Sequence, residues 1–107
     1  MSVIQISAKE LQKKLQGDEK PLLLDVREPH EFEFSYIEGS QLIPLNQIPQ
    51  RMNEIGVSTD CVVICHHGVR SQQAAAFLVH SGFSNIYNLS GGIDAWSVEC
   101  DNTVSRY

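Results

Sequence analysis

The chain has 107 residues, of which 42% are hydrophobic and 20% are charged, so it fits one small globular domain over 1–107 and excludes a two-domain enzyme or a repeat array. Eight basic and 13 acidic side chains give a net charge of −5 without any cluster of Lys or Arg, so we expect no nucleic-acid partner. The apolar runs are only strand-length and no secretory signal opens the sequence, so we expect a cytoplasmic protein that does not interact with membranes.

The first part of the chain predicts a short helix and then a buried strand. Residues 7–10 have the capping-box pattern, and leucines follow at helical spacing as far as Gly17, which is placed to end the helix. The apolar run over 22–26 is typical of a strand buried on both faces of a parallel sheet. Asp25 is the one polar residue in this run.

The middle of the chain predicts shorter elements. Pro29 is placed to start a helical turn through residue 34, and a short strand is expected over 41–43. Pro49 marks the start of another short helix, which is expected to end at residue 56. The second strongly apolar strand is expected over 61–65.

The last part of the chain predicts a longer helix and a further strand. Ser71 is placed to cap a helix over 72–81, which Gly82 ends, and residues 85–87 form a strand candidate. Strands separated by helices indicate an α/β domain with a mainly parallel central sheet flanked by helices. In such sheets, sites form beyond the carboxyl ends of the strands.

The segment over 65–71 contains the residues best suited to catalysis and anion binding. It places the Cys65 thiol between a strand end and a helix start, where free backbone N–H groups and the positive helix end favour a thiolate and bind anions. Gly68 lets successive amides face inward, and Arg70 adds a lasting positive charge. We therefore predict that Cys65 is a nucleophile and that the following residues bind its anionic substrate: His66, His67, Gly68, Val69, Arg70 and Ser71.

Two alternatives compete with that interpretation. Most cysteines in apolar runs are structural, which is how we interpret Cys61, but Gly68, Arg70 and the helix start favour a function for Cys65. A zinc site is disfavoured because Cys61 and Cys65 would lie about 13 Å apart on an extended strand, whereas zinc ligands lie within ~2.3 Å of one ion. No metal is therefore expected. The two histidines either assist the bound anion or are solvated surface, and the sequence leaves both possibilities open.

Three further residues have weaker assignments. Asp25 and Arg27 lie at the same sheet edge as Cys65 and either border the pocket or form a structural ion pair, and the second interpretation is preferred. Cys100 lies in a polar tail whose acidic residues are expected to raise the pKa of its thiol. It is interpreted as an exposed cysteine without a role in catalysis, and resolution of a persulfide by its thiol is the less favoured alternative.

Motifs spread over nearly the whole chain occur in the order and spacing of one known family. They are Leu24-Asp25-Val26-Arg27-Glu28 with Glu31 and Phe32, Ile37 and Gly39, Ile43-Pro44, Cys65-x-x-Gly68-x-Arg70-Ser71, and Gly91-Gly92-x-x-x-Trp96. On these residues the chain resembles the rhodanese domains, which are sulfurtransferases with a three-layer α/β fold. Where that family commonly has Gly-His, this chain has Ser35-Tyr36, so the resemblance gives no support for a role of the family histidine.

The resemblance implies a two-step sulfur transfer without a cofactor. The Cys65 thiolate takes a sulfur atom from a small anionic donor such as thiosulfate, and the loop amides hold the resulting persulfide. A second nucleophile then removes the sulfur: cyanide in vitro, or a thiol or protein acceptor in the cell. Four residues separate Cys65 from Arg70, whereas related cysteine phosphatases have five, so the shorter loop favours one sulfur atom over a phosphate.

A second hypothesis is a persulfide carrier that serves a partner protein and has little activity on free thiosulfate. The ending, over 89–96 with Asp101 and Arg106-Tyr107, resembles the tail of rhodanese domains fused to ubiquitin-activating-like adenylyltransferases. Such domains pass sulfur to small carrier proteins, so molybdopterin, thiamine or tRNA thiolation is the implied setting. The sequence leaves the physiological donor and acceptor open.

Overall fold

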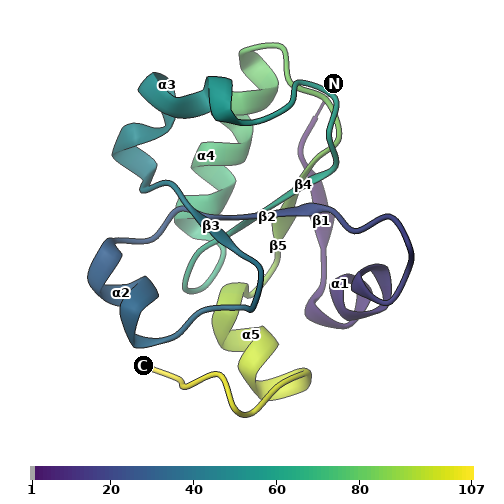
Figure 1. Cartoon of the computed structure of the whole chain (residues 1–107), viewed down its shortest axis with the longest axis vertical. Coiled ribbons are helices and arrows are strands. Elements are labelled where there is room, and N and C mark those ends of the chain that lie inside the picture. The colour runs from purple at the N-terminus through teal and green to yellow at the C-terminus, as the bar shows by residue number, and fades with distance from the viewer. Residues whose placement is uncertain (1) are drawn as a thin grey trace.

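A parallel five-stranded sheet forms the centre of the computed structural model, which describes residues 2–107 (Figure 1). The spatial order is β1-β5-β4-β2-β3, and each neighbouring pair is parallel. The predicted α/β class with a mainly parallel sheet is therefore confirmed. The strands are β1 (Ile4–Ile6), β2 (Leu22–Asp25), β3 (Gln41–Leu42), β4 (Cys61–Ile64) and β5 (Ile86–Leu89).

Helices cover both faces of the sheet and give the expected three layers. The helices are α1 (Ala8–Leu15), α2 (Pro29–Phe34), α3 (Ile48–Arg51), α4 (Val69–His80) and α5 (Gly92–Glu99). On one face, α3 and α4 pack over one apolar cluster, while α1 and α5 pack over a second cluster on the other face. Two short 3-10 segments, η1 (Leu45–Gln47) and η2 (Met52–Glu54), flank α3, so the single short helix predicted from Pro49 to residue 56 is divided between α3 and η2.

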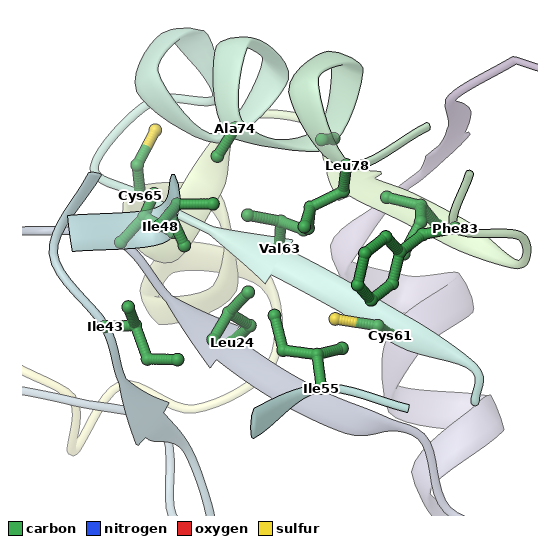
Figure 2. Close-up of a cluster of buried hydrophobic side chains, with 13 residues drawn as sticks. Leu24, Ile43, Ile48, Ile55, Cys61, Val63, Cys65, Ala74, Leu78 and Phe83 are labelled. Carbon is green, nitrogen blue, oxygen red and sulfur yellow. The ribbon is translucent and has the colours of Figure 1, made fainter. Parts of the chain in front are cut away.

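The two apolar strands supply side chains to both clusters because neighbouring residues of a strand point to opposite faces. In β4, Val63 packs under α4 with Leu78, whereas Val62 and Ile64 pack on the α1 and α5 side. Figure 2 shows the first of these clusters, with Cys65 at its edge and the Cys65 sulfur directed toward α4. The strands predicted to be buried on both faces are so in the structure.

The predicted start of α4 is wrong by three residues. Ser71 does not cap the helix, because Gly68 occupies the N-cap position with a φ of +105° and turns the chain into α4 at Val69. A positive φ is a conformation that glycine adopts readily and other residues do not. Ser71 therefore lies in the first helical turn, with its side chain fully buried. The predicted end is confirmed, since Gly82 follows the helix with a φ of +99°.

Two elements were not predicted from the sequence. β1 is only three residues long and joins the sheet beside β5, while α5 begins at a pair of glycines that carry no helical signal. The capping box of α1, by contrast, is present as predicted: the Ser7 hydroxyl accepts the Glu10 N–H, and the Glu10 carboxylate accepts the Ser7 N–H.

Among residues 2–107, no helix combines the length and the apolar character that crossing a membrane requires.

Candidate active site

The segment predicted to carry the chemistry lies at the carboxyl end of β4, the central strand, and leads directly into α4. Backbone hydrogen bonds join the start of α5 to this loop. The Ile93 N–H donates to the Cys65 carbonyl at 2.8 Å, and the Asp94 N–H donates to the His66 carbonyl at 3.2 Å. A Cβ at Gly92 would collide with the backbone of Cys65 and His66, so the close approach of α5 requires glycine there.

The Cys65 thiol is buried at the start of α4, with two hydrogen-bonding groups on its sulfur. The Gly68 N–H donates to Sγ at 3.1 Å, and the Ser71 hydroxyl oxygen lies 3.2 Å from Sγ. Backbone N–H groups and the positive end of a helix both favour negative charge on sulfur. The loop thus brings Cys65, Gly68 and Ser71 together as the sequence predicted, although Ser71 acts through its side chain and not as a helix cap.

Asn88, at the third position of β5, completes the environment of the sulfur and was missed by the sequence reasoning. Its Nδ2 group donates to the Gln5 side chain at 2.9 Å and to the Gly68 carbonyl at 3.3 Å. Its Oδ1 atom is therefore left as an acceptor for the Ser71 hydroxyl, 2.5 Å away. The signal for this role was a buried polar residue inside the apolar run of β5.

Arg70 is paired with Glu31 of α2, so its charge is not left uncompensated beside the loop. Its two terminal nitrogens donate to the two Glu31 oxygens at 2.6 and 2.9 Å, and the Tyr107 hydroxyl donates to the same carboxylate at 2.8 Å. The Arg70 guanidinium lowers the pKa of Glu31 from 4.5 to about 2, with a smaller contribution from the Glu28 N–H. The charge that the sequence assigned to anion binding is thus neutralised in the folded chain.

Asp25 and Arg27 form an ion pair in which both side chains are fully buried, with a shortest distance of 2.7 Å. The Arg27 guanidinium also donates to the Ser35 carbonyl at 2.6 Å and to the Tyr107 hydroxyl at 2.9 Å. All of these bonds tie neighbouring segments together, which agrees with the preferred interpretation of the pair as a structural anchor.

The rings of His66 and His67, in the loop between β4 and α4, stack on each other with ring centroids 4.0 Å apart. The other face of His66 packs on the Tyr107 ring, also at 4.0 Å and nearly parallel. Burial is the main cause that lowers the pKa of His66, and the neighbouring His67 adds to it. The buried Nε2 of His66 has no hydrogen-bond partner among residues 2–107, while His67 is exposed.

The other two cysteines have different surroundings. Cys61 lies in the core under α4, and burial raises the pKa of its thiol to about 12, as expected of a structural cysteine. Cys100 is half-buried, and the pKa of its thiol is raised first by burial and then by the acidic neighbours that the sequence analysis had invoked. Within the described part of the chain, no three His, Cys, Asp or Glu side chains converge as metal ligands.

Fold and loop together define a small α/β domain that holds one cysteine at a helix start. The family model of the rhodanese-like domain matches residues 7–99. This chain therefore belongs to the rhodanese-like domain family.

Curated relatives and solved structures agree with this assignment. A sulfurtransferase of Allochromatium vinosum is 39% identical over 95 residues, which cover 89% of each chain. The thiosulfate sulfurtransferase GlpE of Stutzerimonas stutzeri is 37% identical over 75 residues, which cover 70% of this chain and 69% of that protein. The crystal structure of a rhodanese-like domain protein from Staphylococcus aureus superposes with a TM-score of 0.86 at 28% identity, over 98% of this chain and 99% of that one. Sulfur transfer is thus the general function of this chain.

Proposed function

We propose that this chain is a thiosulfate sulfurtransferase of the rhodanese type and that Cys65 is its nucleophile. The observation that carries the proposal is the buried Cys65 sulfur at the start of α4, within reach of the Gly68 N–H and the Ser71 hydroxyl. The Gly68 N–H stabilises negative charge on the sulfur, and the Ser71 hydroxyl adds to this when it donates to Sγ and not to Asn88; the thiolate is the reactive form of a thiol. The thiosulfate sulfurtransferase among the relatives supports the choice of donor.

In the first step, the Cys65 thiolate attacks the outer sulfur of thiosulfate. A new S–S bond forms at Cys65 while the S–S bond of thiosulfate breaks, and sulfite leaves with the bonding electron pair. The product is the Cys65 persulfide anion, so the total charge is unchanged. The amides of residues 66–70, at the turn into α4, are the groups that we propose to hold the terminal sulfur.

In the second step, an acceptor attacks the terminal sulfur and restores the Cys65 thiolate. Cyanide becomes thiocyanate in vitro, and in the cell we propose a thiol or a protein acceptor. The cycle uses no metal or cofactor. A reducing compartment such as the cytoplasm suits it, because all three cysteines are free and Cys65 must remain reduced between cycles.

A dedicated persulfide carrier is the second candidate function, and the pairing of Arg70 with Glu31 favours it. A site in which Glu31 neutralises Arg70 attracts a free dianion weakly, whereas a partner protein can deliver sulfur through its own contacts. The carrier would form the same Cys65 persulfide but would turn over slowly with thiosulfate and cyanide.

Substitution of Cys65 by serine tests the proposed nucleophile. Cys65→Ser is expected to lower the thiosulfate–cyanide rate at least about 1,000-fold, because a serine hydroxyl neither ionises near neutral pH nor forms a persulfide. Mass spectrometry after incubation with thiosulfate should show an added mass of about 32 Da, one sulfur atom, in the wild-type chain and not in Cys65→Ser.

The matched control is Cys100→Ser, which should keep both the adduct and the turnover. An adduct with negligible turnover in the wild-type chain favours the carrier. Absence of any adduct with thiosulfate and with a protein or small-molecule persulfide contradicts both candidates.

A further inference from the structure

We propose that Glu31 determines which sulfur donors the Cys65 site accepts. By neutralising Arg70, Glu31 disfavours doubly charged donors such as thiosulfate relative to donors whose transferable sulfur carries one negative charge or none. The inference rests on the proposed function of Cys65 and adds to it the charge class of the substrate.

The contact between Glu31 and Arg70 joins two elements that are 39 residues apart in the chain. Both carboxylate oxygens are used, and the Glu31 side chain is only 11% exposed, compared with 35% for Arg70. Two more donors fix the carboxylate: the Glu28 N–H at 3.0 Å and the Tyr107 hydroxyl at 2.8 Å. A bidentate Arg–carboxylate pair with this support is a defined structure and not a transient surface contact.

The pair lies next to the loop that holds the sulfur. Arg70 is in the first turn of α4, one residue before Ser71, whose hydroxyl contacts the Cys65 sulfur. On the other side, Tyr107 connects the Glu31 carboxylate to the His66 ring, since it donates to the first and stacks on the second. Glu31 therefore places its negative charge beside the loop, between Arg70 and the Tyr107 ring that stacks on His66.

The remaining charged side chains around the loop are also paired. Asp25 is bound to Arg27, and Asp94, whose N–H bonds the loop, is bound to Arg106 at 2.8 Å. With Glu31 and Arg70, these are three positive and three negative side chains, so they add no net charge to the site. The groups that remain to attract an anion are the backbone amides of the loop, the Ser71 hydroxyl and the two histidine rings, and the chain as a whole carries a charge of −5.

Thiosulfate and methanethiosulfonate form a matched pair of donors with which to measure this effect. Thiosulfate carries two negative charges and releases sulfite, whereas methanethiosulfonate carries one and releases methanesulfinate. Both transfer a terminal sulfur to the Cys65 thiolate by the same exchange of S–S bonds, and the leaving group takes the bonding electron pair in each case.

The variant Glu31→Gln removes the charge while its amide oxygen still accepts an N–H from Arg70 or Glu28. At low salt we expect kcat/KM for thiosulfate to rise about 5- to 10-fold, and that for methanethiosulfonate about 2- to 3-fold, because Coulomb energy scales with the donor's charge. The gain in log kcat/KM should thus be about twice as large for the dianion, and salt at about 0.5 M should remove most of it.

The control is Glu33→Gln, on the same helix, where the carboxylate is exposed. It should change kcat/KM of either donor by less than about 2-fold, since an exposed charge is screened by solvent. Measuring both donors on the same sample makes their ratio independent of the fraction of folded enzyme. Equal gains for both donors, or no gain for thiosulfate, in Glu31→Gln overturn the inference.

The wild-type chain offers a test that needs no substitution. If Arg70 is neutralised, kcat/KM for thiosulfate should change less than about 2-fold between about 20 mM and about 500 mM NaCl. A steep fall with salt shows that an unpaired cation attracts thiosulfate and overturns the role of Glu31 while leaving the Cys65 mechanism intact. If neither donor modifies Cys65, the proposed function itself fails.

Discussion

The Ser71 hydroxyl has a single proton and faces two acceptors. With Asn88 Oδ1 as the acceptor, a protonated Cys65 thiol can in turn donate its own hydrogen to the Ser71 oxygen. A Cys65 thiolate competes with Asn88 for the Ser71 proton. Loss or gain of negative charge on the Cys65 sulfur is therefore coupled to the hydrogen bond between Ser71 of α4 and Asn88 of β5.

Glu31 should make the stability of the chain depend on pH in a defined range. A carboxyl whose pKa is lower in the folded chain than in the unfolded chain stabilises the fold above the unfolded value, here 4.5. That contribution, roughly 2 kcal/mol, is lost as the pH falls from 4.5 toward about 2.

The measurement compares urea unfolding of the wild-type chain and of Glu31→Gln. The wild-type chain should be the more stable at neutral pH, and this difference should shrink by more than half by about pH 3. Glu33→Gln should show no such dependence. A difference that stays constant over the same range contradicts the ion pair as its source.

At the level of elements, two glycines with positive φ have different tasks. Gly82 only ends α4, and a Cβ there would meet nothing within 4 Å. Gly92, with a φ of +63°, lies against the backbone of the Cys65 loop. Alanine substitutions at Gly82 and Gly92 therefore separate two costs: the conformational cost of a positive φ, and the cost of displacing the Cys65 loop.

Gly82→Ala is expected to lower the free energy of unfolding by about 1 kcal/mol and to leave the rate of persulfide formation unchanged. Gly92→Ala incurs the same conformational cost and also displaces the loop from α5, so it should lower that free energy by about 3 kcal/mol or more and slow persulfide formation at least about 10-fold. Urea unfolding and time-resolved mass spectrometry measure the two effects. Equal effects of the two substitutions on the persulfide rate contradict the role assigned to the start of α5.

The elements that the sequence predicted are those with strong local signals, and the ones it missed depend on contacts elsewhere. The capping box of α1 and the apolar runs of β2 and β4 needed no information from other parts of the chain. β1 is too short to show a period and exists because β5 lies beside it. The Ser71 cap was wrong because Gly68 had already turned the chain into α4.

In the candidate site, too, contacts within one segment could be predicted from the sequence and contacts between distant residues could not. Residues 65–71 are contiguous, so the approach of Gly68 and Ser71 to the Cys65 sulfur could be predicted from chain order alone. The partners of that loop come from distant positions: 39 residues separate Glu31 from Arg70, and 76 separate Tyr107 from Glu31. No pattern along the chain indicates that a glutamate of one helix will neutralise the arginine of another.

On the scale of the whole molecule, residues from near both ends of the chain contact the surroundings of the loop. Gln5, in β1, accepts a hydrogen bond from Asn88, which in turn contacts Ser71. Tyr107 lies beside α2 (Figure 1) and packs on His66. The segment before it is anchored by buried Val104, whose carbonyl accepts the Ser97 hydroxyl.

Tyr107→Ala tests the contribution of this last segment to the site. Removal of the ring exposes His66, and because burial is the main cause that lowers the pKa of His66, that pKa should rise toward 6.5. An NMR titration of the His66 ring protons in the wild-type chain and in Tyr107→Ala measures the change. A His66 titration identical to that of the wild-type chain contradicts the stacking as the source of its burial.

The shortness of the outer strands has a consequence for how the molecule behaves in concentrated solution. β1 offers three residues at one edge of the sheet and β3 offers two at the other, whereas the three longer strands lie inside. A second chain that began to extend the sheet would find too few free N–H and C=O groups in line to hold it. The strand order thus keeps the most apolar and aggregation-prone segments of the sequence away from the two edges of the sheet, where intermolecular strand pairing can start.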